Sequence, residues 1–325
     1  MAILLTGTAG FIGFHVARAL LARGETVIGI DNLNDYYTLD LKNARLEQLL
    51  PQKGFTFHQL DIADHKTLKS IAVKAGVTDI IHLAAQAGVR YSLENPFAYA
   101  ASNLTGHLSV LEVARLLGVN HMVYASSSSV YGANKKTPFA ENDRTDSPVS
   151  LYGATKKSDE NMSVSYGKLY QIPLTGLRFF TVYGPWGRPD MAYWIFTEKI
   201  LKGETISIFN NGDMGRDFTY IDDIVDGIIA ALGMPPSSDE NHHRVFNLGN
   251  NHPEKLMDLV SLLESELGMT AKKSMEGMQK GDVKRTWADI TQAQNMLGYQ
   301  PKVSLADGIH RYIRWRKETG HGFNT

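Results

Sequence analysis

A glycine-rich turn near the start of the chain constrains the possible folds more than any other feature of the sequence. Residues 3–6 form a short apolar run, and Gly7, Gly10 and Gly13 follow it at intervals of three. Residues 14–30 then carry helical spacing followed by a second β-rich run. Glycines in such a turn let the backbone approach a pyrophosphate, and the N-terminus of the next helix offers it free N–H groups. The pattern therefore predicts a dinucleotide-binding strand, turn, helix and strand.

An acidic residue narrows the choice of dinucleotide. Asp31 directly follows the second predicted strand. A carboxylate in this position accepts hydrogen bonds from an adenosine ribose and repels a 2′-phosphate. The sequence therefore predicts NAD rather than NADP as the cofactor.

The alternation of strands and helices continues along the chain. Residues 55–60 are expected to form a third strand that ends at Asp61, and residues 79–83 a fourth strand that ends at Ala84 and Ala85. Small residues at a strand end leave room for a cofactor at the carboxyl edge of the sheet, where open α/β sheets bind ligands. We therefore expect the cofactor to lie across this edge.

A long helical pattern over residues 96–117 contains one notable polar residue. Asn103 lies on an otherwise apolar helix. A buried asparagine needs hydrogen-bond partners, which core groups, water or a cofactor can supply. The sequence leaves open whether Asn103 is a core residue or faces the cofactor.

The first part of the chain is predicted to be one doubly wound α/β domain. Strands at residues 122–125 and 174–179, with a helix at residues 152–169 between them, extend a parallel (Rossmann) sheet. After residue 179, turn formers and aromatic residues become frequent. The expected domains are an NAD-binding Rossmann domain over residues 1–179, joined by part of residues 216–248, and a smaller substrate-binding α/β lobe over residues 180–325. In that second part, helices are predicted at residues 196–201, 221–232, 253–267, 290–297 and 305–318, strands at 206–209 and 245–248, and a turn at 210–215.

Composition excludes several other classes of protein. The formal net charge is -1, which favours neither nucleic acid nor an anionic membrane as a partner. The chain contains no cysteine, so disulfides and thiolate metal sites are excluded, and we expect no metal. No apolar run reaches the roughly 18 residues of a membrane span, and no signal peptide is apparent at the start. The sequence predicts a cytoplasmic protein.

Four consecutive serines, residues 126–129, follow the fifth predicted strand. A serine run usually forms a flexible linker. Directly after an apolar strand, however, its hydroxyls are presented at the same carboxyl edge of the sheet as the predicted cofactor.

A tyrosine and a lysine provide the candidate catalytic pair. Tyr152 and Lys156 stand four residues apart in a predicted helix and therefore share one face. A free phenol has a pKa of about 10 and is a poor base at neutral pH. A nearby ammonium favours the phenolate and makes it a usable base. An exposed pair on an ordinary helix has the same spacing, but the glycine turn, Asp31 and the serine run favour the catalytic interpretation.

Taken together, these motifs resemble the extended short-chain dehydrogenase/reductase family of nucleotide-sugar-modifying enzymes. Residues 34–37 (NDYY), 178–192 (RFFTVYGPWGRPDMA) and 279–283 (QKGDV) are more narrowly similar to UDP-glucuronate 4-epimerases. The resemblance covers essentially the full length. It implies an isomerase that interconverts UDP-glucuronic acid and UDP-galacturonic acid through a transient 4-keto sugar, with NAD tightly bound and recycled.

The resemblance also implies roles for single residues. Tyr152 would act as base and acid, Lys156 would hold the nicotinamide ribose, and Ser127 would bond to O4 of the sugar. Positions that match the family's cofactor contacts are Gly7, Gly10, Phe11, Ile12, Gly13, Asp31, Asn32, Asp61, Ile62, Ala84, Ala85, Asn103, Tyr152 and Lys156. Positions that match its substrate contacts are Ser127, Ser128, Ser129, Thr181 and Arg188 around the sugar, and Arg216 and Asp282 on the nucleotide.

Three departures from related patterns bear on the substrate. Thr181 stands where UDP-galactose 4-epimerases usually carry asparagine, which argues against a neutral hexose. Ser128 and Ser129 replace the Asp-Glu pair of nucleotide-sugar 4,6-dehydratases, so no acid is available to expel water. Lys280 replaces a proline that is common before Gly281 in the family, and its effect is not predicted.

The sequence leaves other functions open. A UDP-glucuronate decarboxylase or a neutral UDP-hexose 4-epimerase would use the same oxidation, and an NAD-binding sensor or scaffold would keep the glycine turn without needing the catalytic pair. The family commonly forms homodimers through two helices, which correspond here to residues 96–117 and 152–169. We therefore expect a UDP-sugar and a second copy of the chain as partners.

Overall fold

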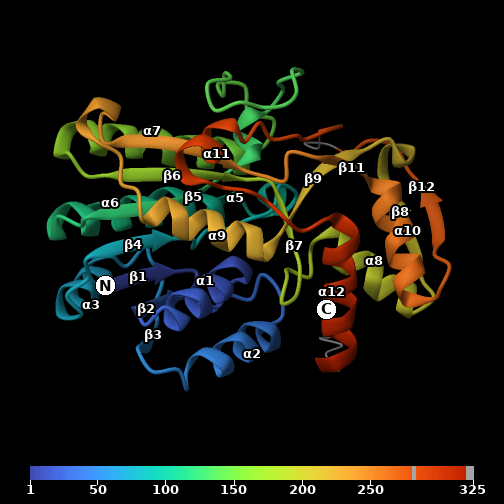
Figure 1. Ribbon diagram of the computed structural model, residues 1–325, viewed down its shortest axis with the longest axis horizontal. Helices are drawn as coiled ribbons and strands as arrows, with labels where there is room; N and C mark the ends of the chain where they lie inside the picture. Colours follow the sequence, from blue (N-terminus) through green and yellow to red (C-terminus); the bar gives the residue numbers. More distant parts are fainter. Residues whose placement is uncertain (280–282, 320–325) are drawn as a thin grey trace.

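The computed structural model describes residues 1–279 and 283–319. A parallel sheet forms the centre of the larger part of the molecule, and its strand order is β10-β6-β5-β4-β1-β2-β3 (Figure 1). Every neighbouring pair of strands in it is parallel. The predicted α/β class and doubly wound sheet are confirmed. The strands are β1 (Ala2–Thr6), β2 (Thr26–Asp31), β3 (Phe55–Gln59), β4 (Asp79–His82), β5 (His121–Ser127), β6 (Leu174–Phe179) and β10 (His243–Leu248).

Helices cover both faces of this sheet. Parallel strands buried on both faces read as continuous apolar runs, and β1 illustrates this. Its Leu4 belongs to one core cluster and its Ile3 and Leu5 to the other, and all three are fully buried. The helices of one face are α1 (Phe11–Ala22), α2 (Leu39–Leu49) and α9 (Ile221–Leu232), and those of the other face are α3 (His65–Lys74), α6 (Gly106–Leu117) and α7 (Leu151–Tyr170).

The sheet has a switch point next to β1. This strand pairs with β2 on one side and with β4 on the other, so the chain runs outward from it in both directions. Open α/β sheets bind ligands at such a point, beyond the carboxyl ends of the strands. The glycine-rich turn follows β1, Asp31 is the last residue of β2, and Ala84 follows β4.

The remaining elements form a smaller layer beside the carboxyl edge of the sheet (Figure 1). Two small sheets, with strand orders β11-β9-β7 and β12-β8, lie among its helices. Aromatic rings join its last helix to the loop after β7: the Trp186 and Trp315 ring centroids are 5.1 Å apart. The elements are β7 (Thr181–Tyr183), α8 (Ala192–Leu201), β8 (Thr205–Ile208), β9 (Gly215–Tyr220), β11 (Pro253–Lys255), α10 (Leu256–Leu267), β12 (Lys272–Met275) and α12 (Leu305–Thr319). Helix α11 (Thr291–Leu297) instead packs against α9 and β10 of the larger part.

Three predicted helices differ from the structure. The helix expected over residues 196–201 begins four residues earlier, at Ala192. The helix expected over residues 253–267 begins only at Leu256, because Pro253–Lys255 pairs with β9 as the edge strand β11. Proline fits an edge strand, where its missing N–H costs no ladder bond. The helix expected over residues 96–117 is not uniform: its Ala100–Thr105 segment is a π-helix between α5 (Pro96–Tyr99) and α6. Such segments are frequent at functional sites.

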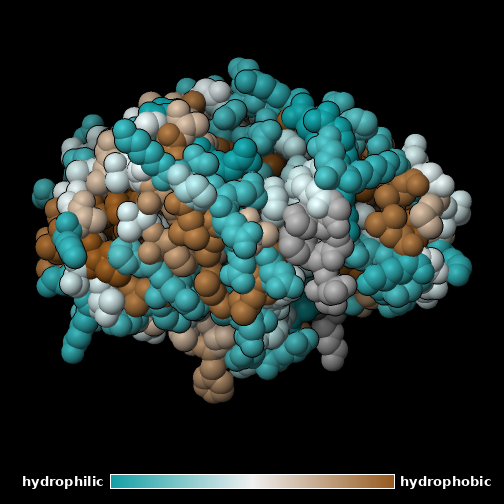
Figure 2. Space-filling view, turned by 90° about the horizontal axis from the view of Figure 1, so that it is seen from below, coloured by the Kyte–Doolittle hydropathy of each residue, from teal (hydrophilic) through white to brown (hydrophobic). Residues whose placement is uncertain are grey.

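The surface is mixed in character. Figure 2 shows polar side chains over much of the face seen from below, with apolar groups between them. Within residues 1–279 and 283–319, no helix is both long and apolar enough to cross a membrane.

Candidate active site

The glycine-rich turn forms a cradle at the N-terminus of α1 that side chains would fill. A Cβ on Gly13 would lie 2.0 Å from the Gly7 carbonyl oxygen, and a Cβ on Gly7 would lie 2.7 Å from the Ala84 nitrogen. Gly7 also has a φ of +74°, which favours glycine. The N-cap residue of α1, Gly10, has no side chain to bond to the free N–H groups. The cradle therefore fits a dinucleotide phosphate, which these N–H groups bind.

Asp31 is held in place at the end of β2. Its Oδ2 accepts a hydrogen bond from the Ala9 N–H at 3.1 Å, and its Oδ1 accepts one from the Leu33 N–H at 2.9 Å. Burial lowers the pKa of Lys42, which lines the same cavity and donates to the Asn34 carbonyl oxygen at 2.6 Å. A carboxylate and a lysine are thus both available at the adenosine end of the predicted cofactor site.

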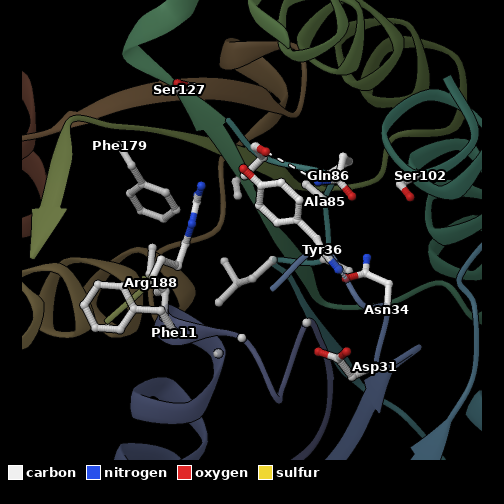
Figure 3. Close-up of a pocket in the computed structure, with 18 of the residues that line it drawn as sticks. Phe11, Asp31, Asn34, Tyr36, Ala85, Gln86, Ser102, Ser127, Phe179 and Arg188 are labelled. Atoms are coloured by element: carbon white, nitrogen blue, oxygen red, sulfur yellow. Dashed lines mark hydrogen bonds between the residues drawn. The ribbon is translucent and has the colours of Figure 1, made fainter. Parts of the chain in front are cut away.

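One cavity runs along this carboxyl edge, and Figure 3 shows side chains that line it. It brings together most of the predicted cofactor residues. Asp61 is exposed and does not line it; its Oδ2 accepts a hydrogen bond from the Asn32 side chain at 3.0 Å. The predicted cofactor residues that do line the cavity are Gly7, Gly10, Phe11, Ile12, Gly13, Asp31, Asn32, Ile62, Ala84, Ala85, Tyr152 and Lys156.

Asn103 supports the wall of this cavity and does not line it. Its side chain is buried; Oδ1 accepts from the Gln86 N–H at 2.8 Å, and Nδ2 donates to the Gln86 carbonyl oxygen and to Thr155 Oγ1. Of the two roles that the sequence left open, the geometry agrees with the hydrogen-bonded core residue. Asn103 thereby ties the loop after β4 to α7.

Tyr152 and Lys156 lie on one face of α7, as their spacing predicts. Ser150 begins the helix and accepts a hydrogen bond from the Gly153 N–H at 3.1 Å. Lys156 is only 2% exposed, and its Nζ donates to the Ala125 carbonyl oxygen at 3.0 Å. Tyr152 is partly exposed and lines the cavity beside it.

A buried acid next to Lys156 escaped sequence reasoning. Asp159 is fully buried and lies 3.1 Å from Lys156 Nζ. Burial raises the pKa of Asp159 to about 6, against the opposing effect of the lysine charge. No signal pointed to this pair, because acidic residues near a lysine on a helix are usually solvated.

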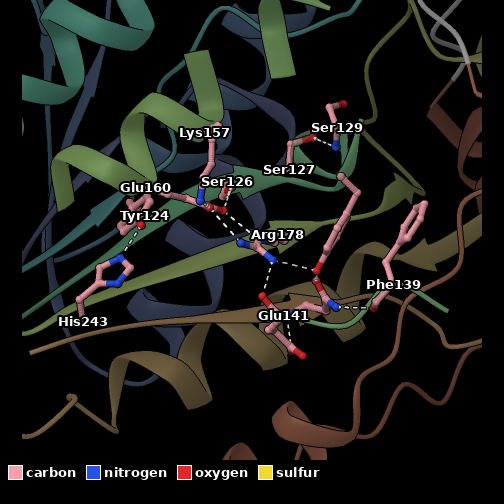
Figure 4. Close-up of polar contacts among 12 residues, drawn as sticks. Tyr124, Ser126, Ser127, Ser129, Phe139, Glu141, Lys157, Glu160, Arg178 and His243 are labelled. Atoms are coloured by element: carbon pink, nitrogen blue, oxygen red, sulfur yellow. Dashed lines mark hydrogen bonds and ion pairs between the residues drawn. The ribbon is translucent and has the colours of Figure 1, made fainter. Parts of the chain in front are cut away.

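A polar network lies beneath the serine run (Figure 4). Ser126 Oγ donates to Glu160 at 2.7 Å, and Glu160 receives two bonds from Arg178 at 2.8 and 2.9 Å. Arg178 also donates to the Tyr131 hydroxyl at 3.0 Å. Ser126 lines the first cavity, but its hydroxyl is bound to this buried network. A signal was available for Arg178, since a charged residue inside an apolar strand needs a buried partner.

The other serines line a second cavity next to the first. Ser127 Oγ accepts a hydrogen bond from the Ser129 N–H at 3.1 Å, which leaves its own hydroxyl proton for another acceptor. Asp282 lies outside the described residues. The second cavity is lined by the six other predicted substrate residues, Ser127, Ser128, Ser129, Thr181, Arg188 and Arg216. Residues that line both cavities are Ser127, Tyr152, Phe179, Phe180, Arg188 and Met191.

The fold and the paired cavities define a class of enzyme. Residues 3–249 match the model of the NAD dependent epimerase/dehydratase family, and the chain belongs to this family. It is 50% identical to UDP-glucuronate 4-epimerase 4 of Arabidopsis thaliana over 96% of this chain and 74% of the relative. It is 46% identical to a probable UDP-glucuronate 4-epimerase of Rhizobium meliloti over 97% of this chain and 96% of the relative.

A solved structure agrees with these relatives. The crystal structure of UDP-glucuronic acid 4-epimerase from Bacillus cereus, in complex with UDP-glucuronic acid and NAD, superposes with a TM-score of 0.91. The sequences are 36% identical, and the match covers 98% of this chain and all of the other. The predicted family, and NAD as its cofactor, are therefore confirmed.

Proposed function

We propose that this protein is an NAD-dependent 4-epimerase that interconverts UDP-glucuronic acid and UDP-galacturonic acid through a transient 4-keto sugar. One observation carries the proposal: Tyr152 and Ser127 line both cavities, whereas Lys156 lines only the one with the glycine cradle. A base placed in this way can reach a sugar hydroxyl beside a bound dinucleotide. The similarity to UDP-glucuronate 4-epimerases supports the same substrate.

In this proposal the first cavity holds NAD by the glycine cradle and Asp31. When bound, NAD supplies an acceptor for the C4 hydride and returns the hydride to the opposite face of the sugar. Lys156 has two hydrogen bonds to the protein, to Ala125 and Asp159, and a third donor remains for the nicotinamide ribose.

Tyr152 is assigned to proton transfer. As phenolate it takes the proton from the C4 hydroxyl and later returns it, and the Lys156 ammonium favours that phenolate. Ser127 is assigned to the C4 oxygen, because its hydroxyl proton is free to bond to it. General acid-base catalysis by a placed side chain contributes about 10²–10⁴-fold.

The sugar must turn between the two hydride transfers while the nucleotide stays bound. Arg216, which lines the second cavity, is assigned to the nucleotide, together with Asp282. The hydroxyls of Ser128, Ser129 and Thr181 offer bonds that can be exchanged as the sugar turns.

The carboxylate of the substrate could be lost as carbon dioxide from the 4-keto sugar, and residues of the second cavity are placed to prevent this. In the 4-keto sugar the C5 carboxylate is β to the ketone, and it is lost readily when its C–C bond stands perpendicular to the carbonyl plane. Fixed donors hold that bond away from perpendicular, at about 1.5–3 kcal/mol for each hydrogen bond to a charged acceptor. Arg188, Thr181 and Ser129 are the donors that we assign to the carboxylate.

Product analysis tests this function against its alternatives. We expect purified protein, incubated with UDP-glucuronic acid without added NAD, to form UDP-galacturonic acid in NMR spectra. UDP-xylose or a 4-keto pentose as the main product would favour a decarboxylase, and turnover of neutral UDP-hexoses alone would favour a hexose epimerase. Tyr152→Phe separates an enzyme from an NAD-binding scaffold, because it removes the base and leaves the cradle intact.

We further propose that the protein is a cytoplasmic homodimer. Apolar side chains are exposed on the two helices expected to form the dimer, among them Leu108, Leu116, Val164 and Leu169. Phe97, just before the π-helix, is 83% exposed. Light scattering of the wild type and of Leu169→Glu tests the dimer, and cell fractionation tests the location.

A further inference from the structure

Two loops from distant parts of the sequence meet between the two cavities. One follows β2 and carries Tyr36; the other follows β7 and carries Arg188 and Asp190. Asp190 binds Arg188 through Nε at 3.0 Å and through Nη2, and its Oδ2 also accepts a hydrogen bond from the Tyr36 hydroxyl at 3.0 Å. We call the side chains of Tyr36, Arg188 and Asp190 the clasp.

Two of the three clasp side chains line the cofactor cavity. Tyr36 lines that cavity, and Arg188 lines both. Figure 3 shows the Tyr36 and Arg188 side chains reaching toward each other from opposite sides, between Asp31 and Ser127. A dinucleotide that extends from Asp31 toward Tyr152 would therefore run past these two side chains.

A buried arginine anchors the loop that carries Arg188. Arg45 of α2 is fully buried and donates to the Trp186 carbonyl oxygen at 2.6 Å and to the Gly187 carbonyl oxygen at 2.9 Å. The loop that carries Arg188 is thus held from below, independently of Tyr36. Tyr36, by contrast, reaches Asp190 through one hydroxyl.

A third loop is shaped to fit the Tyr36 hydroxyl. A Cβ on Gly88, in the loop after β4, would lie 2.7 Å from that oxygen, and Gly88 has a φ of +100°. The Tyr36 ring also packs on the Tyr91 ring, with centroids 4.7 Å apart. The position of Tyr36 is therefore set by its surroundings.

The clasp also decides which part of Arg188 is available. Asp190 occupies the edge formed by Nε and Nη2, so the two N–H groups of Nη1 and the second N–H of Nη2 are left for an acceptor. Burial raises the pKa of Asp190, but the Arg188 charge outweighs this and lowers it below the usual range. Asp190 thus stays a carboxylate that holds the arginine by one edge.

We propose that Tyr36 and Asp190 are positioning residues: they hold Arg188 by one edge toward the sugar cavity, and their contact retains NAD beneath the clasp. The retention of NAD does not depend on which sugar is bound. The positioning of Arg188 toward the sugar rests on the proposed function.

The release of NAD tests the retention directly. We expect Tyr36→Phe, which removes one hydroxyl, to release bound NAD about tenfold faster than the wild type. The dissociation rate is followed in protein purified with its cofactor, by dilution into an enzyme that consumes free NAD, with no sugar present. Asp190→Ala, which removes both acceptor oxygens, should accelerate release at least as much.

A double variant and a matched control complete this test. Because Tyr36 and Asp190 act through one bond, Tyr36→Phe/Asp190→Ala should release NAD no faster than the faster single variant. Tyr91→Phe removes a hydroxyl from the neighbouring ring without touching Asp190, and it should release NAD at the wild-type rate. The proposal that the clasp retains NAD is wrong if both single variants release NAD at the wild-type rate. It is also wrong if Tyr91→Phe accelerates the release of NAD as much as they do.

The positioning of Arg188 is tested with the sugar. We expect Tyr36→Phe to raise the KM for UDP-glucuronic acid severalfold at saturating NAD and to change kcat by less than twofold. If the KM is unchanged, the claim that Tyr36 positions Arg188 is wrong, even if NAD is released faster. If the wild type turns over no UDP-uronic acid at all, the proposed function fails, and the release of NAD still decides the retention.

Discussion

Two arginines ten residues apart, Arg178 and Arg188, make nearly the same contacts and serve different ends. Each binds a carboxylate through Nε and Nη2, and each group includes a tyrosine hydroxyl. The side chains of Arg178 and Glu160 are 3% and 2% exposed, whereas those of Arg188 and Asp190 are 24% and 30% exposed.

The difference in burial separates a structural pair from a pair at a binding site. Arg178 also bonds through Nη1, to the Tyr131 hydroxyl and the Glu141 carbonyl oxygen, so its bonding capacity is directed inward. Arg188 stands at the junction of two cavities with one edge of its guanidinium held. The same chemical pair thus stabilises the fold in one place and presents a charge to a ligand in the other.

Breaking the buried pair should have the largest effect on stability. We expect Glu160→Gln to lower the free energy of unfolding by about 3–5 kcal/mol, because it leaves the buried Arg178 charge without its partner. Urea unfolding followed by circular dichroism measures this loss. Asp190→Asn is the matched change in the other pair and should cost about 1 kcal/mol or less. Equal losses for the two variants would show that burial does not separate the two ion pairs.

Arg188 should matter for the reaction rather than for the fold. We expect Arg188→Lys to lower kcat/KM for UDP-glucuronic acid at least tenfold, because a lysine lacks the planar fork. We also expect it, and Thr181→Val, to leak some UDP-pentose, as the carboxylate is less firmly held. Product analysis by NMR measures the leak. A clean mixture of the two epimers from both variants would contradict the assignment of these residues to the carboxylate.

Acid should weaken the buried scaffold. Burial lowers the pKa of His82 to about 3 and those of His121 and His243 to about 4. The unfolded chain takes up these protons below about pH 6.5 and the folded chain does not, so stability falls as the pH drops, by about 1.4 kcal/mol per unit for each histidine. Asp159 and Asp217, with pKa values raised to about 6, act in the opposite direction below pH 6.

Unfolding at different pH values checks this balance. We expect a lower free energy of unfolding at pH 5 than at pH 7, and a smaller difference in His243→Gln. Equal stability at the two pH values would show that the two carboxylates fully offset the histidines.

Two residues of the serine run should differ least in their effect on stability. Ser126→Ala removes a bond to Glu160, which keeps its two bonds to Arg178, so we expect a loss of about 1 kcal/mol. Ser128 lines the second cavity, and Ser128→Ala should leave the unfolding free energy within about 0.5 kcal/mol. The reverse order in thermal unfolding would contradict the roles given to these two serines.

Much of the sheet and of the site could be predicted, because the signals were local. The glycine spacing marked the turn at the N-terminus of α1, and the four-residue spacing placed Tyr152 and Lys156 on one face of α7. Pro253 was assigned to a helix because an apolar helical pattern follows it directly. Its pairing with β9, some forty residues earlier in the chain, has no local signal.

What the sequence by itself determined is the class of the protein: a doubly wound sheet, an NAD cradle and a tyrosine–lysine pair, each carried by residues close together in the chain. Only the tertiary structure decided which polar residues face the cavities and which face one another. Asn103 turned inward to Gln86, and Asp190 met Tyr36 across some 150 residues. Burial and hydrogen bonding of these groups depend on segments that meet only when the chain has folded, so spacing along the sequence does not encode them.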